Sequence, residues 1–292
     1  MRILLASVHY WNPQGDGLHQ SLRPDPQPRL QALQAQLLAL RRLDQGQCQL
    51  HIAQRAVLPA NEALRHQIDV RLITDGEHTV VDRLQPAYAA MVQEVVTHPA
   101  HGRLLGFEAQ RFLASQLDAG YDLYAYFEDD LVVHDPLFFH KIHWFQGLMG
   151  GGSVLLPQRI ELHREPHHVD RFYIDGPMSE ADLRQLIPEP APTVVAQLPM
   201  GSAVFDSPAN PHAGCFVLTA EQMRLWVDHP SWQDGDCSFV SPLESAATLG
   251  IAKVFQLYKP AFSHASWLEV QHWGTSFHQL IGNVSSVDDQ SP

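Results

Sequence analysis

Three consecutive carboxylates interrupt an apolar, strand-forming run near the middle of the chain. The run extends from Tyr121 to Phe127, and Glu128, Asp129 and Asp130 follow it directly. Because successive side chains of a strand point to opposite faces, we expect Glu128 and Asp130 to project together and Asp129 to point away. Hard oxygen ligands at the C-terminal end of a buried strand suit a Mg²⁺ or Mn²⁺ ion that also holds substrate phosphates. A solvated turn after a strand is the alternative interpretation of such a triplet.

The acidic strand end resembles the metal-binding motif of GT-A-type glycosyltransferases. In that motif a hydrophobic strand delivers Asp-any-Asp, or a variant such as Glu-Asp-Asp, to the diphosphate of a nucleotide sugar. The resemblance implies that Asp130 binds the ion directly, and that Glu128 reaches it directly or through water, or touches the ribose. It also places Asp129 beside the donor. A late histidine often completes the protein ligands in such enzymes. His264 stands where that ligand is expected and His272 is the alternative, although a histidine in such an aromatic context is more often a packed core or rim residue.

Two other strand ends carry candidate donor contacts. The first strand, residues 1–8, leads into a turn-rich loop over residues 10–17 that begins with Tyr10, and α/β sheets place ligands at this end of their strands. An ordinary β-to-α connection would look the same. Asp75 ends a strand over residues 70–74 and could hold ribose or base. The Asp-Gly sequence favours the alternative, in which the Asp75 side chain caps its own turn.

A carboxylate for general base catalysis is expected near the start of a short helix over residues 241–250. In inverting GT-A enzymes a carboxylate near the start of such a helix activates the acceptor hydroxyl, and the resemblance therefore makes Glu244 the candidate. Ser241 and Glu244 also have the spacing of a capping box, which needs no catalytic role. Asp234 and Asp236 in the preceding loop are rival candidates.

The elements that position these residues alternate between strand and helix in the first half. The periodicity predicts strands over 1–8, 49–53, 70–74 and 121–128, and helices over 29–43, 86–96 and 103–119. This alternation predicts a largely parallel, nucleotide-binding sheet with helices on both faces. With the resemblance, it indicates an α/β fold: a single-domain GT-A-like α/β/α sandwich with a Rossmann-like central sheet.

The second half has fewer regular elements. We expect a helix over 136–146, strands over 153–160, 212–218 and 252–258, a capping box at 219–222 and a further segment over 261–267. Many prolines between 161 and 211 predict long binding loops there, and His163, His167 and His168 are interpreted as surface or acceptor contacts. One domain is expected over 1–283, with a nucleotide-sugar-binding half to about 135, an acceptor-binding half from about 136 and a disordered tail over 284–292.

Composition limits the function classes. The 292 residues, of which 45% are hydrophobic, can bury the core of one large α/β domain. A net charge of -13 argues against a nucleic-acid-binding surface. Three cysteines without metal-ligand spacing point to a reducing compartment, and hence to the cytoplasm. The apolar run at residues 1–8 is too short for a signal peptide or a transmembrane segment.

The sequence therefore predicts a glycosyltransferase that depends on a divalent metal ion. Its expected donor is a nucleotide sugar, a UDP-sugar in preference to a GDP-sugar, and its expected acceptor is a hydroxyl group of a carbohydrate or another molecule. Two other classes stay open. A metal-dependent hydrolase would fit the 18 histidines and 32 acidic residues, but its expected paired ligand motifs are missing. A non-catalytic protein that binds nucleotide sugar or metal is the second alternative, although no EF-hand loop supports calcium.

Overall fold

The computed structural model describes residues 1–15, 20–44, 47–163, 170–199 and 201–281. His167, His168, the end of the loop after the first strand and the predicted tail lie outside these residues.

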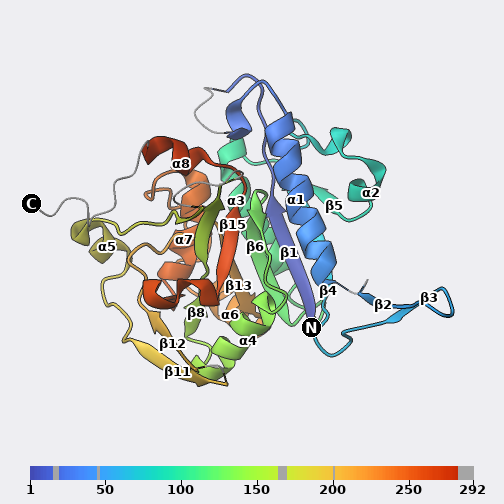
Figure 1. Cartoon of the computed structure of the whole chain (residues 1–292). Coiled ribbons are helices and arrows are strands. Elements are labelled where there is room, and N and C mark those ends of the chain that lie inside the picture. The colour runs from blue at the N-terminus through green and yellow to red at the C-terminus, as the bar shows by residue number, and fades with distance from the viewer. Residues whose placement is uncertain (16–19, 45–46, 164–169, 200, 282–292) are drawn as a thin grey trace, which may run out of the picture.

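A five-stranded sheet forms the centre of the molecule, in the order β13–β6–β1–β4–β5 (Figure 1). Its strands are β1 (Arg2–Val8), β4 (Gln67–Thr74), β5 (Gln93–Val96), β6 (Leu123–Glu128) and β13 (Cys215–Thr219). The first four run parallel, and β13 is antiparallel to β6. The predicted α/β class with a largely parallel central sheet is confirmed.

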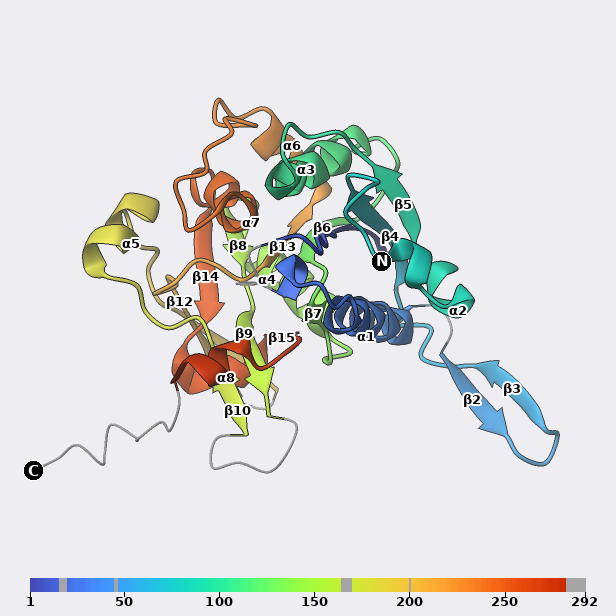
Figure 2. The same ribbon diagram turned by 90° about the horizontal axis from the view of Figure 1, so that it is seen from above.

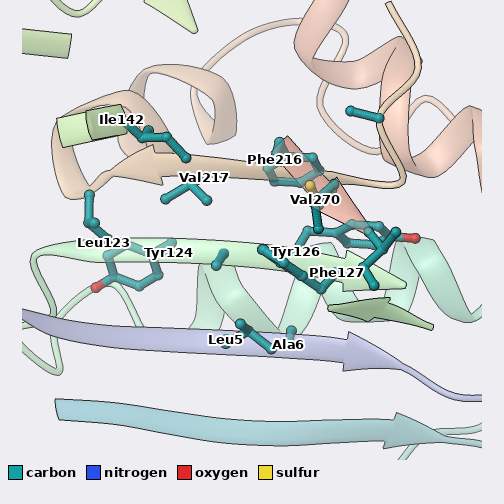
Figure 3. Packing of buried hydrophobic residues seen from close by; sticks show 14 of the residues in the cluster. Leu5, Ala6, Leu123, Tyr124, Tyr126, Phe127, Ile142, Phe216, Val217 and Val270 are labelled. Carbon is teal, nitrogen blue, oxygen red and sulfur yellow. The ribbon is translucent and has the colours of Figure 1, made fainter. Parts of the chain in front are cut away.

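The strands at the centre of this sheet are apolar on both faces, as the strands of a parallel sheet covered by helices must be. Along β6 every residue from Leu123 to Phe127 is buried. Tyr126 stacks on Phe216 of β13 with ring centroids 5.0 Å apart, and Phe127 packs against the aromatic start of α4 (Phe138–Met149). Figure 3 shows this packing between β1, β6 and β13.

Helices cover both faces of the sheet (Figure 2). One face is covered by α1 (Gln27–Leu43) and α4, and the other by α3 (Leu105–Ser115) and α6 (Ala220–Val227). Polar contacts tie them to the strands: the Ser7 hydroxyl donates to Gln36 of α1 at 2.7 Å. On the other face, the Tyr124 hydroxyl donates to the Gln116 carbonyl, just after α3, at 3.0 Å. Three layers result, as the sandwich prediction requires.

Two smaller four-stranded sheets complete the second half, in the orders β10–β9–β15–β7 and β11–β12–β14–β8. Their strands are β7 (Leu131–Val132), β8 (Ser153–Leu155), β9 (Gln158–Leu162), β10 (Arg171–Tyr173), β11 (Val194–Leu198), β12 (Gly201–Asp206), β14 (Gln256–Pro260) and β15 (Glu269–His272). The helices here are α5 (Glu180–Leu186), α7 (Pro242–Ala252) and α8 (Ser276–Ile281). Because β15 pairs with β7, residues near 272 return to the acidic end of β6.

Several predicted elements differ in the structure. The predicted helix over 86–96 is wrong: α2 covers only Pro86–Ala89, and the β-branched residues that follow form the edge strand β5. The predicted strand over 49–53 forms β2 (Cys48–His51), which pairs only with β3 (Ala56–Pro59) among the described strands. This hairpin projects from the body, outside the central sheet (Figures 1 and 2).

The second half contains more regular structure than predicted. The expected long loop over 161–211 is wrong, because β10, α5, β11 and β12 lie within it. The predicted strand over 153–160 divides into β8 and β9 around Pro157, which has no N–H to donate to a ladder. Helix α7 continues past its expected stop at Gly250, where a side chain would collide with the Trp226 ring. Short 3-10 helices cover Gln20–Leu22, Val81–Arg83, Gly102–Leu104 and Phe262–Trp267. Within the described ranges, no helix is both long and apolar enough to cross a bilayer.

Candidate functional site

Three parallel strands bring candidate residues to one edge of the central sheet. Val8, at the end of β1, is in register with Ile73 of β4 on one side and Glu128 of β6 on the other. The residues that follow these strands therefore share the carboxyl edge, where open α/β sheets bind ligands.

Asp129 is held by partners within the protein. It is buried, its Oδ2 lies 2.5 Å from His9 Nδ1, and its Oδ1 accepts from Arg29 Nη1 at 2.6 Å. His9 Nε2 accepts the backbone N–H of Val80 at 3.0 Å, so the ring carries its proton on Nδ1 and donates to Asp129. Both carboxylate oxygens of Asp129 are occupied in this way.

Asp130 differs from its neighbour in the partners of its two oxygens. Its Oδ2 accepts from Arg29 Nη1 at 3.0 Å and lies 3.6 Å from His272 Nε2. Its Oδ1 is buried and has no hydrogen-bond partner among the described residues. Burial alone would raise the pKa of Asp130, but the charges of His272 and Arg29 lower it below the usual value. Asp130 is therefore a buried anion with an acceptor atom to spare.

His272 is oriented toward Asp130 by a second, fully buried carboxylate. Its Nδ1 lies 3.0 Å from Glu161 Oε1. Glu161 also accepts from the backbone N–H groups of Phe277 and His278 and contacts His278 Nδ1 at 3.0 Å. Burial opposes ionisation of both groups, but these contacts lower the pKa of Glu161, and the charges of Asp130 and Glu161 raise the pKa of His272. A carboxylate behind a histidine is the arrangement that fixes the ring of a metal ligand.

Glu128 occupies a buried niche beside Asp130. Burial raises the pKa of Glu128 to about 8, and the charges of Asp130 and Glu244 contribute to the rise. The niche depends on Gly214, which has φ +62°, because a Cβ there would lie 2.8 Å from Glu128 Oε2. His212 Nε2 lies 4.0 Å from Glu128 Oε1. Burial holds the pKa of His212 well below its usual value, so this ring is neutral near pH 7.

A buried group of alternating charges lies next to Glu128. Arg159 donates to Asp175 from Nη2 at 2.6 Å and from Nε at 3.0 Å, and Lys259 Nζ donates to Asp175 at 3.0 Å. Arg159 also lowers the pKa of both Glu128 and Asp130 through its charge. The acidic strand end thus has two permanent cations, Arg29 and Arg159, among its charged neighbours.

The two candidate base regions have different surroundings. Glu244 lies in the first turn of α7 and accepts a hydrogen bond from the Ser241 hydroxyl. Ser241 makes no side-chain cap to the helix backbone, so the predicted reciprocal capping box does not form between these two described residues. Asp234 and Asp236 accept from Lys253 Nζ at 2.6 and 2.7 Å. Hydrogen bonding to Lys253 lowers the pKa of Asp236 to about 2.

The candidate donor contacts lie at the ends of β1 and β4. Asp75 Oδ1 accepts the backbone N–H groups of Glu77 and His78 at 3.0 and 2.7 Å, so this side chain caps its turn. These hydrogen bonds lower the pKa of Asp75 against the effect of burial. His78 Nδ1 lies 2.8 Å from Asp75 Oδ2, and its ring packs on Tyr10 with centroids 5.2 Å apart. Gly102 also lies against the Tyr10 ring, where a Cβ would collide with it.

The two candidate histidines fall in different places. His264 lies in a 3-10 segment, and its Nδ1 is 2.9 Å from the Ser263 hydroxyl. His272 lies beside Asp130. Within the part of the chain that the structure describes, no group of three or more His, Cys, Asp or Glu side chains is arranged to hold a metal ion by itself.

Several residues at this edge were not singled out from the sequence. His9 directly follows the first strand, a position that could have marked it as a strand-end residue. Arg29 begins the predicted helix and lies on its buried face, which is a usable signal because buried Arg is nearly always paired. Glu161 gives no such signal, since only the return of the chain through β15 brings it to His272.

Comparisons with known proteins give distant structural likenesses only. No family model matches the chain, and no curated protein matches it. Among solved structures, it is similar to a mannose-1-phosphate geranyltransferase from Thermus thermophilus, with 15% identity, a TM-score of 0.40, and coverage of 89% of this chain and 73% of that one. It is also similar to S. aureus TarS 1-349 in complex with UDP-GlcNAc, with 12% identity, a TM-score of 0.43, and coverage of 98% and 62%.

A third likeness is to mouse xyloside xylosyltransferase 1, with 11% identity, a TM-score of 0.38, and coverage of 88% of this chain and 83% of that one. The chain spans only 38% of a longer S. aureus TarS structure, with 10% identity and a TM-score of 0.44. At these identities and TM-scores the likenesses establish no activity for this chain.

Proposed function

We propose that this chain is a glycosyltransferase that requires a divalent cation and moves a sugar from a nucleoside-diphosphate donor to an acceptor hydroxyl. The observation that supports this most is the Oδ1 atom of Asp130, which has no partner among the described residues and is buried beside an oriented His272. A buried acceptor atom without a partner costs about 1–3 kcal/mol, and more when it is charged. A bound cation removes that cost.

The residues present fit a Mg²⁺ or Mn²⁺ ion shared with substrate. Asp130 and His272 would hold the ion, and Glu128 would reach it directly or through water. Such ions are commonly bound by one or two protein ligands together with substrate phosphates, so a complete protein cage is not needed. We propose His272 rather than His264 for this role, because His272 Nε2 lies 3.6 Å from Asp130 Oδ2. When bound, the ion neutralises the charge that develops on a departing nucleoside diphosphate.

The donor nucleotide would lie over the ends of β1 and β4, in the half up to about residue 135. Tyr10 offers an aromatic surface there, and His78 lies between Tyr10 and Asp75. Because both oxygens of Asp75 are already engaged, we propose that Asp75 acts by orienting His78 rather than by binding ribose itself. A UDP-sugar is the proposed donor. Asp129 would keep Arg29 in place behind Asp130.

We propose Glu244 as the general base in preference to Asp234 and Asp236. Its charge contributes to the raised pKa of Glu128, which supports a role beside the acidic strand end. Asp236 is bound to Lys253 and has a pKa of about 2, far below the value that suits a base at neutral pH. Glu244 would accept the proton of the acceptor hydroxyl as that oxygen attacks the sugar. The acceptor would then occupy the half from about residue 136 to 283.

Calorimetry with UDP and GDP tests the metal requirement. We expect UDP to bind in the presence of Mn²⁺ and to lose binding when a chelator is added. Asp130→Asn should abolish the part of UDP binding that depends on Mn²⁺. Asp135→Asn is the matched control, because Asp135 pairs with Lys141 outside the site, and it should bind as wild type does. Tight binding of UDP without metal would contradict the proposal.

Turnover separates the proposal from its two alternatives. Incubation with UDP-sugars and a panel of hydroxyl acceptors should give UDP together with a glycosylated acceptor. Release of free sugar that no acceptor suppresses would indicate a hydrolase. Metal-dependent binding without any turnover would indicate a binding protein. A cytoplasmic location belongs to the same proposal, and the three free cysteines suit a reducing compartment.

A further inference from the structure

A pair of histidines lies at the opposite edge of the central sheet from the acidic triplet. His66 immediately precedes β4, and its backbone N–H donates to the Leu43 carbonyl at the end of α1 at 3.1 Å. His140 lies in the first turn of α4. The two ring centroids are 4.5 Å apart with 37° between the planes. Neither histidine is among the residues assigned above to donor, metal or acceptor.

Three ring nitrogens of the pair lack hydrogen-bond partners within the described chain. His66 is only 2% exposed. Neither of its ring nitrogens, nor Nδ1 of His140, has such a partner among the described residues. A neutral imidazole has one N–H donor and one acceptor nitrogen, and each such buried group left without a partner destabilises the fold. Native proteins rarely keep such groups without a compensating ligand or water.

The pair offers neutral imidazole nitrogens, which are ligands for transition-metal ions. Burial lowers the pKa of His66 to about 4, with a contribution from His140, and burial lowers the pKa of His140 as well. Both rings are therefore neutral near pH 7 and present lone pairs. The Phe139 ring packs edge-to-face with His66, with centroids 5.5 Å apart, and the charge of the N-terminal ammonium also lowers the pKa of both histidines.

The ring spacing is compatible with binding of one shared metal ion. With metal–nitrogen bonds of about 2.0–2.1 Å, two imidazoles at right angles around one ion have centroids roughly 4.5 Å apart, and a tetrahedral pair roughly 5.2 Å apart. The observed 4.5 Å matches the right-angle arrangement. Right angles occur in square-planar and octahedral sites, which Cu²⁺ and Ni²⁺ prefer when nitrogen ligands are present.

We propose that His66 and His140 form a binding site for a divalent transition-metal ion of the Cu²⁺ or Ni²⁺ class. The ring nitrogens without partners in the described chain would supply two adjacent ligands. Water would supply the others, since no third His, Cys, Asp or Glu joins the pair to form a metal-holding group among the described residues. His140 is less buried than His66 and would be the side from which the ion enters.

Electron paramagnetic resonance of the full chain with one equivalent of Cu²⁺ tests this site. We expect a single tetragonal species with hyperfine coupling to imidazole nitrogen. His140→Ala should remove that species and weaken Cu²⁺ binding at least about tenfold in calorimetry. His98→Ala, at an exposed histidine beyond the end of β5, is the matched control and should keep both the Cu²⁺ species and the affinity. Asp130→Asn should also keep the resonance species and the Cu²⁺ affinity of the wild type. This result would separate the histidine site from the proposed donor site.

His66→Asn serves as the second variant, and its circular dichroism shows whether it folds. If it folds, it should lose the same species. Cu²⁺ binding that is unchanged in His140→Ala would overturn the proposal and indicate adventitious binding by surface histidines. Absence of any stoichiometric binding by wild type would also overturn it and would leave water as the partner of these rings.

Discussion

Asp129→Asn is expected to destabilise the fold rather than to act on substrate binding directly. The side chain is almost isosteric, so the change removes one negative charge and leaves the packing in place. Arg29, buried in α1, and His9 each contact one carboxylate oxygen of Asp129, at 2.6 and 2.5 Å, and asparagine would leave an oxygen for only one of them. The remaining partner of Arg29 would be Asp130, at 3.0 Å.

The expected loss of stability depends on the hydrogen-bond partners that remain for Arg29 and His9. Removing one partner of a buried ion pair costs about 3–5 kcal/mol when the other charge is left unpaired. Arg29 keeps Asp130, and the asparagine oxygen can still accept one hydrogen bond. We therefore expect a loss of about 2–3 kcal/mol in the free energy of unfolding, below that range. For a chain of this size that loss lowers Tm by roughly 3–5 °C.

Urea unfolding followed by circular dichroism measures the free energy of unfolding. The slope of this free energy against urea concentration should be the same for the wild type and the variants. Asp118→Asn is the control, because Asp118 is exposed and its ion pair is with the half-exposed Arg224. Its expected change is within about 0.5 kcal/mol. If Asp129→Asn were as stable as Asp118→Asn, the assignment of Asp129 to the framework would be wrong.

Three further outcomes are expected. Glu161→Gln should weaken Mn²⁺ binding about 10- to 100-fold in calorimetry, because it loosens the orientation of His272; unchanged affinity would remove Glu161 from the site. As the pH falls from 6.5 toward 4, the wild type should lose about 1–2 kcal/mol in its free energy of unfolding relative to His66→Phe. The reason is that folding lowers the pKa of His66 from 6.5 to about 4, so the unfolded chain takes up the proton first. Parallel curves of stability against pH, measured by urea unfolding, would contradict this. Glu244→Gln should keep the wild-type Tm and affinity for UDP but lose at least about a hundredfold in turnover; near-normal turnover would exclude Glu244 as the base.

The central sheet could be predicted because its main strands have a strong local pattern. The runs at residues 1–8, 70–74 and 121–128 are largely apolar on both faces, and burial on both faces is what a helix-covered parallel sheet requires. The strands β10, β11 and β12 of the second half have no such apolar run and were not predicted. Their pairing partners can lie far away in the chain, as for β12 with β14, and without an apolar run a strand of three to six residues has too little periodicity to be recognised.

The structure brings the acidic triplet to the carboxyl edge of the central sheet, as expected, but the partners of each carboxylate could not be predicted from the sequence. Alternation along a strand suggested that Asp129 would separate from Glu128 and Asp130. The structure adds that the chain turns after Glu128, so that Arg29 reaches Asp129 and Asp130 with the same nitrogen. No local pattern encodes which of the two keeps an oxygen available, because that depends on His9, which follows another strand.

The choice between His264 and His272 shows how the return of the chain creates the site. Both histidines stand late in the sequence at similar distances from the acidic motif, so spacing could not separate them. In the structure, β15 pairs with β7, which places His272 opposite Leu131, and the Trp273 N–H donates to the Asp130 carbonyl at 2.7 Å. The backbone therefore fixes Asp130 and His272 together before either side chain meets a ligand. An oriented pair of this kind loses little conformational freedom on binding, which is what a site completed by substrate phosphates requires.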